Sequence, residues 1–297
     1  MSEKISERKS FFRKIRGKQE DGTPVKAEMS FIDHLEELRW HIVRSAIALV
    51  IAAIIIFVFI DWIFDHIIYA PAREDFITYH GLCNLGHALH LGNALCMPPV
   101  KIPLLINTVG GTFTSAIDIC FMGGLIIALP YLLWEIWRFI KPALSPKELK
   151  YARGSIGWIS LCFFCGAAFG YYLLAPFTFN FLASFKLGNL GVQTYLPSLE
   201  DYIDTLVNIM LGCGLAFELP VMAYVLAKIG LITPAYLKNY RKYAYVLILI
   251  VAAVITPSPD WTSQTIVAVP LILLYEISIF IVLRVEKQKI KEDKEWS

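Results

Sequence analysis

The chain has 297 residues, of which 57% are hydrophobic and 18% are charged, and its formal net charge is +2 at pH 7. An ordinary soluble domain is about 45–50% apolar and about 25% charged, so this composition argues against a protein that folds in water alone. The apolar residues form long runs rather than an amphipathic pattern, which indicates membrane spans rather than soluble cores.

The N-terminal segment, residues 1–28, contains eight basic residues and no apolar stretch, so we expect a cytoplasmic tail without a cleavable signal peptide. The first apolar run covers residues 42–60. Beyond it, Ala70-Pro71-Ala72 formally matches a small-residue cleavage site, but this motif lies far from both the N-terminus and the end of the run. We therefore interpret the run as a retained span.

Five further apolar runs follow, and most are long enough to cross a hydrocarbon core about 30 Å thick at about 1.5 Å per residue. They are residues 114–140, 155–177, 206–229, 243–255 and 265–283. The run at 243–255 is short enough for a re-entrant segment, but basic residues before it and polar residues after it favour a short full span. We therefore predict an all-α membrane protein with six transmembrane helices.

The distribution of positive charge predicts the orientation of these spans. Four segments hold 24 of the 27 Lys and Arg residues: 1–44, 138–153, 228–242 and 284–297. The positive-inside rule therefore places both termini in the cytoplasm. Three parts follow from this topology: a basic cytoplasmic tail (1–28), a transmembrane domain (29–283) with an enlarged outer loop (61–113), and a charged cytoplasmic tail (284–297).

The outer loop contains Cys83 and Cys96, which are separated by twelve residues. We predict a disulfide between them, because an oxidising exterior permits it and closing such a loop stabilises by about 3 kcal/mol on the chain-entropy model. Two unrelated thiols are the alternative. His87 and His90 could indicate a metal in the same loop, but two histidines without a third ligand are weak evidence. We expect no metal and no cofactor.

Two carboxylates interrupt apolar runs, Glu218 in the fourth and Glu276 in the sixth. A charged group near mid-bilayer costs about 2.5–3.5 kcal/mol, so each needs a reason. Each is either protonated and hydrogen-bonded between helices or, as we favour, faces a polar cavity that receives a substrate or partner. Asp260 and Gln264, near the outer end of the sixth run, would extend such a polar track.

Four prolines interrupt or end the apolar runs: Pro130, Pro176, Pro220 and Pro270. Because proline removes a helical hydrogen bond and frees a carbonyl, these residues predict kinked or broken spans. We expect the six helices to form a concave bundle rather than a tight cylinder.

The start of the first span predicts an acidic helix face. Ser30 and Asp33 fit a capping box, so a helix should begin there. At about 100° per residue, Asp33, Glu36 and Glu37 fall within one arc of about 100°. One interpretation is that acids are favoured in the first turns of a helix. The other is that this patch accepts the guanidinium groups of an arginine-bearing ligand in bidentate hydrogen bonds, which lysine cannot copy.

An ordered series of segments carries a family resemblance. The series is Phe31-Ile-Asp-His-Leu-Glu-Glu-Leu-Arg39, Pro130 with Trp137-Arg-Phe139 and Pro142-Ala-Leu144, Glu148, Gly166 to Tyr171 with Pro176, Phe217-Glu-Leu-Pro220, and Thr256-Pro-Ser-Pro-Asp-Trp-Thr-Ser-Gln264. Over about residues 30–283 it resembles the TatC family, the polytopic component of the twin-arginine protein translocase.

The resemblance implies recognition of folded export substrates through an Arg-Arg signal peptide at the bacterial cytoplasmic (inner) membrane, with transport powered by the proton motive force and no hydrolysis. It implies that Glu37 and Glu148 occupy the positions of the signal-binding acids, with Glu36, Arg39 and Phe139 beside them. By itself, Glu148 fits a solvated loop acid equally well.

The resemblance also implies partners within the membrane. Glu218 matches an intramembrane acid associated with docking of small single-span TatA-like and TatB-like proteins, and Asp260 with Gln264 match the last outer loop. Further copies of the chain and membrane lipids are expected partners. Tyr171 matches a family aromatic for which packing is an equal explanation. Glu135 departs from the pattern, as either an additional signal contact or an interfacial acid, and so do the cysteine-containing loop and the basic tail.

Two other classes of function fit the sequence less well. A secondary transporter would use Glu218 and Glu276 as proton or ion sites, but the internal repeats it predicts are not found. An intramembrane enzyme would need a motif such as His-Glu-x-x-His or Gly-x-Ser-x-Gly, and neither occurs. The basic residues follow membrane topology rather than one patch, so nucleic-acid binding is not indicated.

Overall fold

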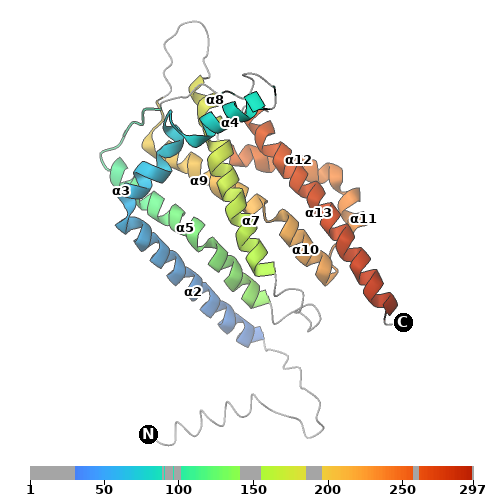
Figure 1. The fold of residues 1–297 in the computed structure, drawn as a ribbon. Coiled ribbons are helices and arrows are strands. Elements are labelled where there is room, and N and C mark those ends of the chain that lie inside the picture. Colours follow the sequence, from blue (N-terminus) through green and yellow to red (C-terminus); the bar gives the residue numbers. More distant parts are fainter. Residues whose placement is uncertain are drawn as a thin grey trace, which may run out of the picture. The chain divides into compact units, whose positions relative to one another are not determined.

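The structure is a computed structural model that describes residues 31–88, 90, 96, 102–140, 155–184, 196–256 and 261–295. These residues are almost wholly helical (Figure 1), apart from short turns and one isolated bridge between Leu105 and Ser198. The chain divides into two units, Met1–Ile42 and Val43–Ser297, and the packing given below is that within the second.

The first span and the outer loop form the first group of helices. Helix α2 runs from Phe31 to Val58, whereas Ser30, the predicted cap, lies outside the described residues. The loop then contains α3 (Ile60–Ile63), a π-helical turn η1 (Phe64–Ile68), a 3₁₀ turn η2 (Ala70–Ala72) and α4 (Ile77–Ala88). The part of the outer loop from 61 to 88 is therefore folded into helices within the second unit.

The second, third and fourth spans follow as long helical segments. The second is α5 (Gly111–Ile140). The third joins α7 (Ser155–Phe169), a π-helical turn η5 (Gly170–Leu174) and α8 (Ala175–Ser184). The fourth joins α9 (Leu199–Ala216) and α10 (Leu219–Ile229) across a two-residue turn.

The C-terminal part contains α11 (Pro234–Asn239), α12 (Arg241–Ile255) and α13 (Trp261–Glu295). Five segments of the described chain are long and apolar enough to cross a membrane, and α12, the predicted short span, has only 15 residues. Helix α13 continues through most of the predicted tail at 284–297. The all-α membrane fold is confirmed, whereas the cytoplasmic position of both termini and the concavity of the bundle stay predictions.

Side chains at the helix ends explain several of these boundaries. Helix α9 begins after Ser198, whose hydroxyl accepts from the backbone N–H of Asp201 at 3.0 Å. Helix α11 begins after Thr233 in the same way, and its next residue, Pro234, suits the first helical position. Helix α10 ends at Gly230, which has a φ of 91°, a left-handed conformation that glycine adopts at little cost.

The four prolines have different local effects. Helices α5 and α13 continue through Pro130 and Pro270, so no span is broken there. Pro176 follows the π-helical turn η5 and cannot donate to the carbonyl of Tyr172, four residues earlier. The hydroxyl of Thr78 on α4 donates to that carbonyl instead. The freed backbone group therefore attaches the outer loop to the third span.

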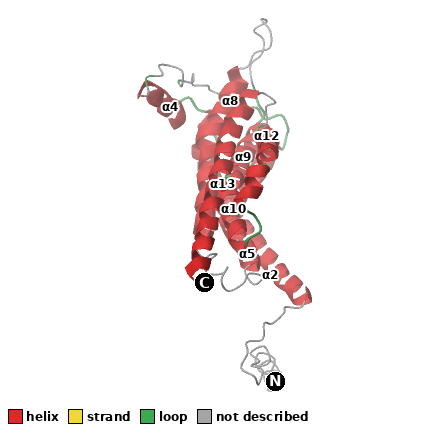
Figure 2. Cartoon of the chain, turned by 90° about the vertical axis from the view of Figure 1, so that its right-hand side faces the viewer, coloured by secondary structure: helices red, strands yellow, loops and turns green. Residues whose placement is uncertain are grey.

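Small residues permit close packing inside the second unit. Helix α9 packs against both α7 and α5, and α13 packs against both α10 and α12 (Figures 1 and 2). A Cβ atom added at Gly124 of α5 would lie 3.0 Å from the backbone nitrogen of Ala53 on α2. Such backbone-to-backbone approach is typical of helices that associate in lipid, where small side chains line the interface.

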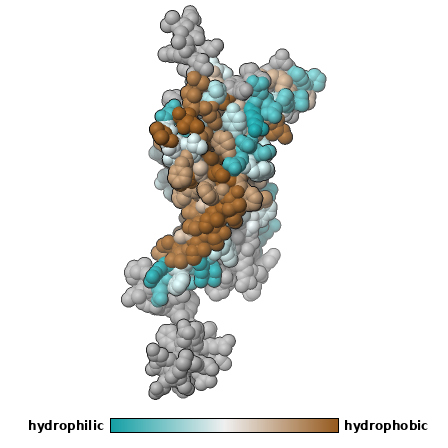
Figure 3. Space-filling view, turned by 90° about the vertical axis from the view of Figure 1, so that its left-hand side faces the viewer, coloured by the Kyte–Doolittle hydropathy of each residue, from teal (hydrophilic) through white to brown (hydrophobic). Residues whose placement is uncertain are grey.

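The outward side of α2 is strongly apolar. Its residues Ile47, Val50, Ile54 and Val58 are each more than half exposed, and Figure 3 shows a band of apolar side chains along the face of the molecule that carries this helix. In water this surface would be unfavourable, because burying apolar area is worth about 25 cal/mol per Å². Hydrocarbon chains of the bilayer cover it instead.

Candidate functional site

The predicted signal-binding residues come from the start of α2, the end of α5 and the following loop. Glu36 and Arg39 on α2 are exposed, whereas Glu37 is half-buried. One carboxylate oxygen of Glu37 is shielded from solvent and has no hydrogen-bond partner among the residues that the structure describes. Phe139 is half-buried in the last turn of α5. Glu148 lies outside the described residues.

Glu135, three residues before Arg138 on α5, is a buried acid with partners of its own. Its side chain is 1% exposed and lies 3.8 Å from the guanidinium of Arg138. The hydroxyl of Tyr131, one turn earlier, donates to the same carboxylate oxygen at 2.8 Å. Glu135 is therefore held by two side chains of its own helix, whereas its roles as a signal contact or an interfacial acid stay predictions.

Glu218 occupies the turn between α9 and α10. Cys213 and Leu215 accept hydrogen bonds from the backbone across this turn, and Pro220 stands in the first turn of α10, where a missing N–H is tolerated. Of the four prolines, Pro220 is thus the one that accompanies a break between two helices of one span. The break places the Glu218 side chain near the backbone of Phe163 on α7, but without a hydrogen bond of good geometry.

The Glu218 carboxyl group is buried without a partner. The residue is 6% exposed, and neither carboxylate oxygen has a hydrogen-bond partner within the described ranges. On the adjoining turns, the ring of Phe163 packs against Gly214, and the rings of Phe169 and Phe217 lie 5.4 Å apart. A buried polar group that lacks a partner costs about 1–3 kcal/mol, so this position is unfavourable until a donor reaches it.

Glu276 on α13 is held by α12 instead. The guanidinium of Arg241 donates to one carboxylate oxygen at 2.8 Å, and the hydroxyl of Tyr245 donates to the other. Both partners come from the first turns of α12. Glu276 is thus hydrogen-bonded between two helices, but as one member of an ion pair rather than as the protonated group of the first interpretation.

Gln264 also connects α12 with α13. Its side-chain amide donates to the backbone carbonyl of Leu249 at 3.0 Å. Neither carboxylate oxygen of Glu218 has a hydrogen-bond partner within the described residues, so its side chain shares no network with Gln264 or Glu276. Asp260 lies outside the described residues. The expected polar track from Glu218 to the last outer loop is thus not formed by direct contacts of the described side chains.

Sequence reasoning missed the residues that neutralise two of the interior acids. Tyr131 and Arg138 stand four residues before and three residues after Glu135, a spacing that places side chains together on a helix and could have predicted the contact. Arg241 and Tyr245 also stand four residues apart, but nothing in the sequence indicates that they face Glu276 across two helices.

The disulfide of the outer loop is present. Cys83 of α4 is bonded to Cys96, as the sequence predicted. The remaining four cysteines are free.

Comparison with known proteins places these features in a family. The model of the family described as Sec-independent protein translocase protein (TatC) matches residues 33–270. A Sec-independent protein translocase protein TatC of Blattabacterium sp. is 39% identical over 265 residues, which cover 89% of this chain and 98% of the relative. A TatC protein of Deinococcus radiodurans is 32% identical over 256 residues, which cover 86% of each chain.

A solved structure agrees with the fold as well as with the sequence. The crystal structure of the twin arginine translocase receptor TatC in DDM matches this chain with a TM-score of 0.66 and 32% sequence identity. The match covers 84% of this chain and 98% of the chain in the crystal structure. None of these relatives supports the secondary transporter. The chain therefore belongs to the TatC family, and it is a multi-pass subunit of the Sec-independent protein translocase in the bacterial cytoplasmic membrane.

Proposed function

We propose that this chain is the receptor subunit that binds twin-arginine signal peptides of folded export substrates. The observation that carries the proposal is the likeness, at 32% identity, to a structure named as the twin arginine translocase receptor. The acids Glu36 and Glu37 at the start of α2 fit the same function, because they supply negative charge for a pair of guanidinium groups.

Glu37 is the preferred contact of the two acids. It has one carboxylate oxygen that is shielded from water and unpaired within the described residues. A guanidinium can donate to both oxygens of a carboxylate in parallel, and such charge-assisted pairs are about twice as strong as neutral hydrogen bonds. An ammonium group is a point donor without this geometry, so Arg-Arg should bind better than Lys-Lys. Glu148 would supply the second acid from the loop between α5 and α7.

Glu218 is the proposed docking point for small single-span partners of the TatA-like and TatB-like kind. Its orphaned carboxyl group would accept a hydrogen bond from a polar side chain of a partner helix packed near α7 and α10. Forming that bond would remove the cost of the unpartnered group, so docking would be favoured by about 1–3 kcal/mol. Association between copies of this chain in the assembled complex is part of the same proposal.

The test of the receptor function is photo-crosslinking of a twin-arginine signal peptide to the protein in vesicles. We expect labelling to need both arginines of the peptide and both Glu37 and Glu148 of the chain, so Lys-Lys peptides and the variants Glu37→Ala and Glu148→Ala should label weakly. Glu286→Ala is the matched control, because Glu286 is an exposed acid on α13. Equal labelling by both peptides and all variants would contradict the proposal.

The docking proposal has a separate readout. Glu218→Ala should weaken crosslinking to the single-span partners while signal-peptide labelling stays measurable, and Glu218→Gln should retain part of the docking because an amide still accepts a hydrogen bond. Loss of signal-peptide labelling with docking intact would show that Glu218 has been assigned to the wrong partner.

A further inference from the structure

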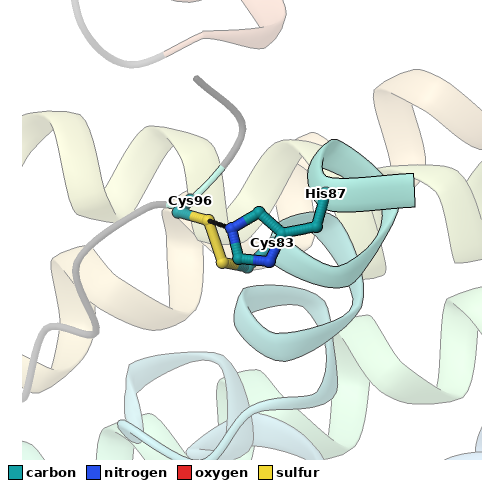
Figure 4. Close-up of side chains that lie close together, drawn as sticks. All are labelled: Cys83, His87 and Cys96. Carbon is teal, nitrogen blue, oxygen red and sulfur yellow. Dashed lines mark hydrogen bonds between the residues drawn. A yellow bond between two sulfur atoms is a disulfide. The ribbon is translucent and has the colours of Figure 1, made fainter. Parts of the chain in front are cut away.

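The outer loop contains a cluster of three side chains of metal-binding type. Cys83 and His87 stand four residues apart on α4 and therefore share one face of that helix, while Cys96 reaches the same point from the chain that follows (Figure 4). The Nε2 atom of His87 lies 3.9 Å from the Sγ atom of Cys96. The two sulfur atoms and the histidine ring nitrogen all lie within 4.8 Å of one another.

These separations are close to those of a zinc site. Zinc is bound by thiolates at about 2.3 Å and by imidazole nitrogen at about 2.0–2.1 Å in a tetrahedral arrangement, which places its ligand atoms roughly 3.5–4 Å apart. The distance from His87 to Cys96 already meets this requirement. Only the two sulfur atoms, which share a covalent bond, must separate before a cation can enter.

We propose that Cys83, His87 and Cys96 form a redox-gated site for a thiophilic divalent cation such as Zn²⁺. A dithiol reductant supplies two electrons and two protons, so that the disulfide becomes two thiols and the reductant becomes its own disulfide. Zn²⁺ then binds both sulfurs as thiolates and the imidazole nitrogen, and the two thiol protons are released to water. Three protein ligands leave the fourth position to a water molecule.

The surroundings of the cluster allow this exchange. His87 is exposed, and Cys83 and Cys96 are half-buried, so a reductant and a cation can reach the sulfurs. The other end of α4 is fixed: the ring of Phe76, just before the helix, meets the ring of Tyr171 edge-on at 5.6 Å, and Thr78 donates to the backbone of the third span. The loop is thus closed by a covalent bond in one state and by the cation in the other, on the same anchored helix.

The two histidines alone gave too little evidence for a metal. The sequence also contains the two cysteines, but a predicted disulfide leaves neither of them as a thiolate that could bind a metal. The structure adds the position of His87 beside Cys96, which makes the reduced pair and the imidazole one ligand set.

Zinc content of the full-length protein in detergent tests the proposal. The protein is reduced with a phosphine, freed of reductant under anaerobic conditions, incubated with Zn²⁺ and separated from unbound metal by gel filtration. We expect about one more Zn²⁺ per chain than in the oxidised protein, and the same excess over the reduced Cys83→Ser/Cys96→Ser variant, which retains the four other cysteines. With Co²⁺ as the probe, thiolate-to-metal absorption should appear only in the reduced wild type.

The variant His87→Ala tests whether the His87 imidazole binds the metal or only lies beside the two sulfur atoms. Loss of even an outer-shell partner lowers metal affinity by about 10–100-fold, so loss of the imidazole ligand should weaken Zn²⁺ binding at least about tenfold. His66→Ala is the matched control, because His66 is exposed and pairs with the backbone of Trp62 instead. Both variants should still form the disulfide, which non-reducing electrophoresis reports and which shows that the loop has folded.

Three results would overturn the proposal. They are no zinc uptake by the reduced protein, equal uptake by the oxidised and reduced proteins, and uptake that neither the double cysteine variant nor His87→Ala reduces.

Discussion

Replacing Gly166 with alanine should loosen the packing between α7 and α9, next to the buried carboxyl group of Glu218. A Cβ atom at this position would lie 2.5 Å from the backbone carbonyl oxygen of Cys213 and 2.7 Å from the Cβ atom of Phe217. Ordinary contact begins at 3.4 Å, so the first distance is about 0.9 Å too short. The carbonyl oxygen belongs to a helix backbone and cannot rotate away. The two helices must therefore move apart.

The cost of this movement follows from the size of the clash. Adding a methyl group to a well-packed core destabilises a protein by about 1–3 kcal/mol, and the clash here is with backbone rather than with a flexible side chain, which favours the upper end. Alanine is better than glycine in a helix by about 1 kcal/mol, which offsets part of the cost. We expect Gly166→Ala to lower the free energy of unfolding by about 1–2 kcal/mol.

Gly157→Ala is the matched control on the same helix. A Cβ atom at Gly157 has nothing within 4 Å, so this substitution should keep its helix-propensity gain and stabilise by about 0.5–1 kcal/mol. Thermal unfolding of both variants in detergent, followed by circular dichroism, provides the comparison. Equal stability of the two variants would refute the close packing of α7 on α9, and so would higher stability of Gly166→Ala.

Three further substitutions test separate contacts. Tyr171→Phe removes a buried hydroxyl that donates to the carbonyl of Ile67 at 2.7 Å and should cost about 1–2 kcal/mol in a thermal scan, whereas Tyr172→Phe, on an exposed ring, should cost little. Arg241→Gln should destabilise by about 1 kcal/mol or less, because both members of its pair with Glu276 are more than a third exposed; a larger loss than for Lys242→Gln in denaturant unfolding is the expected result. Cys83→Ser should abolish the mobility difference between reduced and oxidised protein on gels and cost about 3 kcal/mol of stability, and a retained difference would contradict the pairing with Cys96.

Most of the fold could be predicted because membrane spans depend on composition over about twenty residues, which a single sequence shows directly. Five of the long apolar segments agree with the structure. Folding of the outer loop into α4 was not predicted, because its sequence lacks a long apolar run and its packing depends on distant aromatic residues such as Tyr171.

The polar site was predictable only in part, since the position of an acid in the sequence does not reveal its partner. Glu218 and Glu276 occupy equivalent settings in the sequence, each within an apolar run. In the structure, Glu276 meets Arg241 across two helices, whereas neither carboxylate oxygen of Glu218 has a hydrogen-bond partner among the described residues. A cross-helix contact between residues 35 positions apart depends on tertiary packing, and no local spacing rule reports it.

The difference between the interior acids bears on the proposed docking function. Glu135 and Glu276 have donors within the chain, so a partner protein would have to displace existing hydrogen bonds to reach them. Glu218 offers its carboxyl group without such competition, and it stands at a helix break beside the tight contact of Gly166 with Cys213. Close backbone packing at this point restricts the movement of the two helices, so they cannot easily shift to bring a donor from this chain to the carboxyl group. A hydrogen-bond donor from another chain would therefore remove the whole cost of the unpaired Glu218 carboxyl group. A Gly166→Ala variant, which loosens α7 from α9, should then weaken partner docking as well as stability.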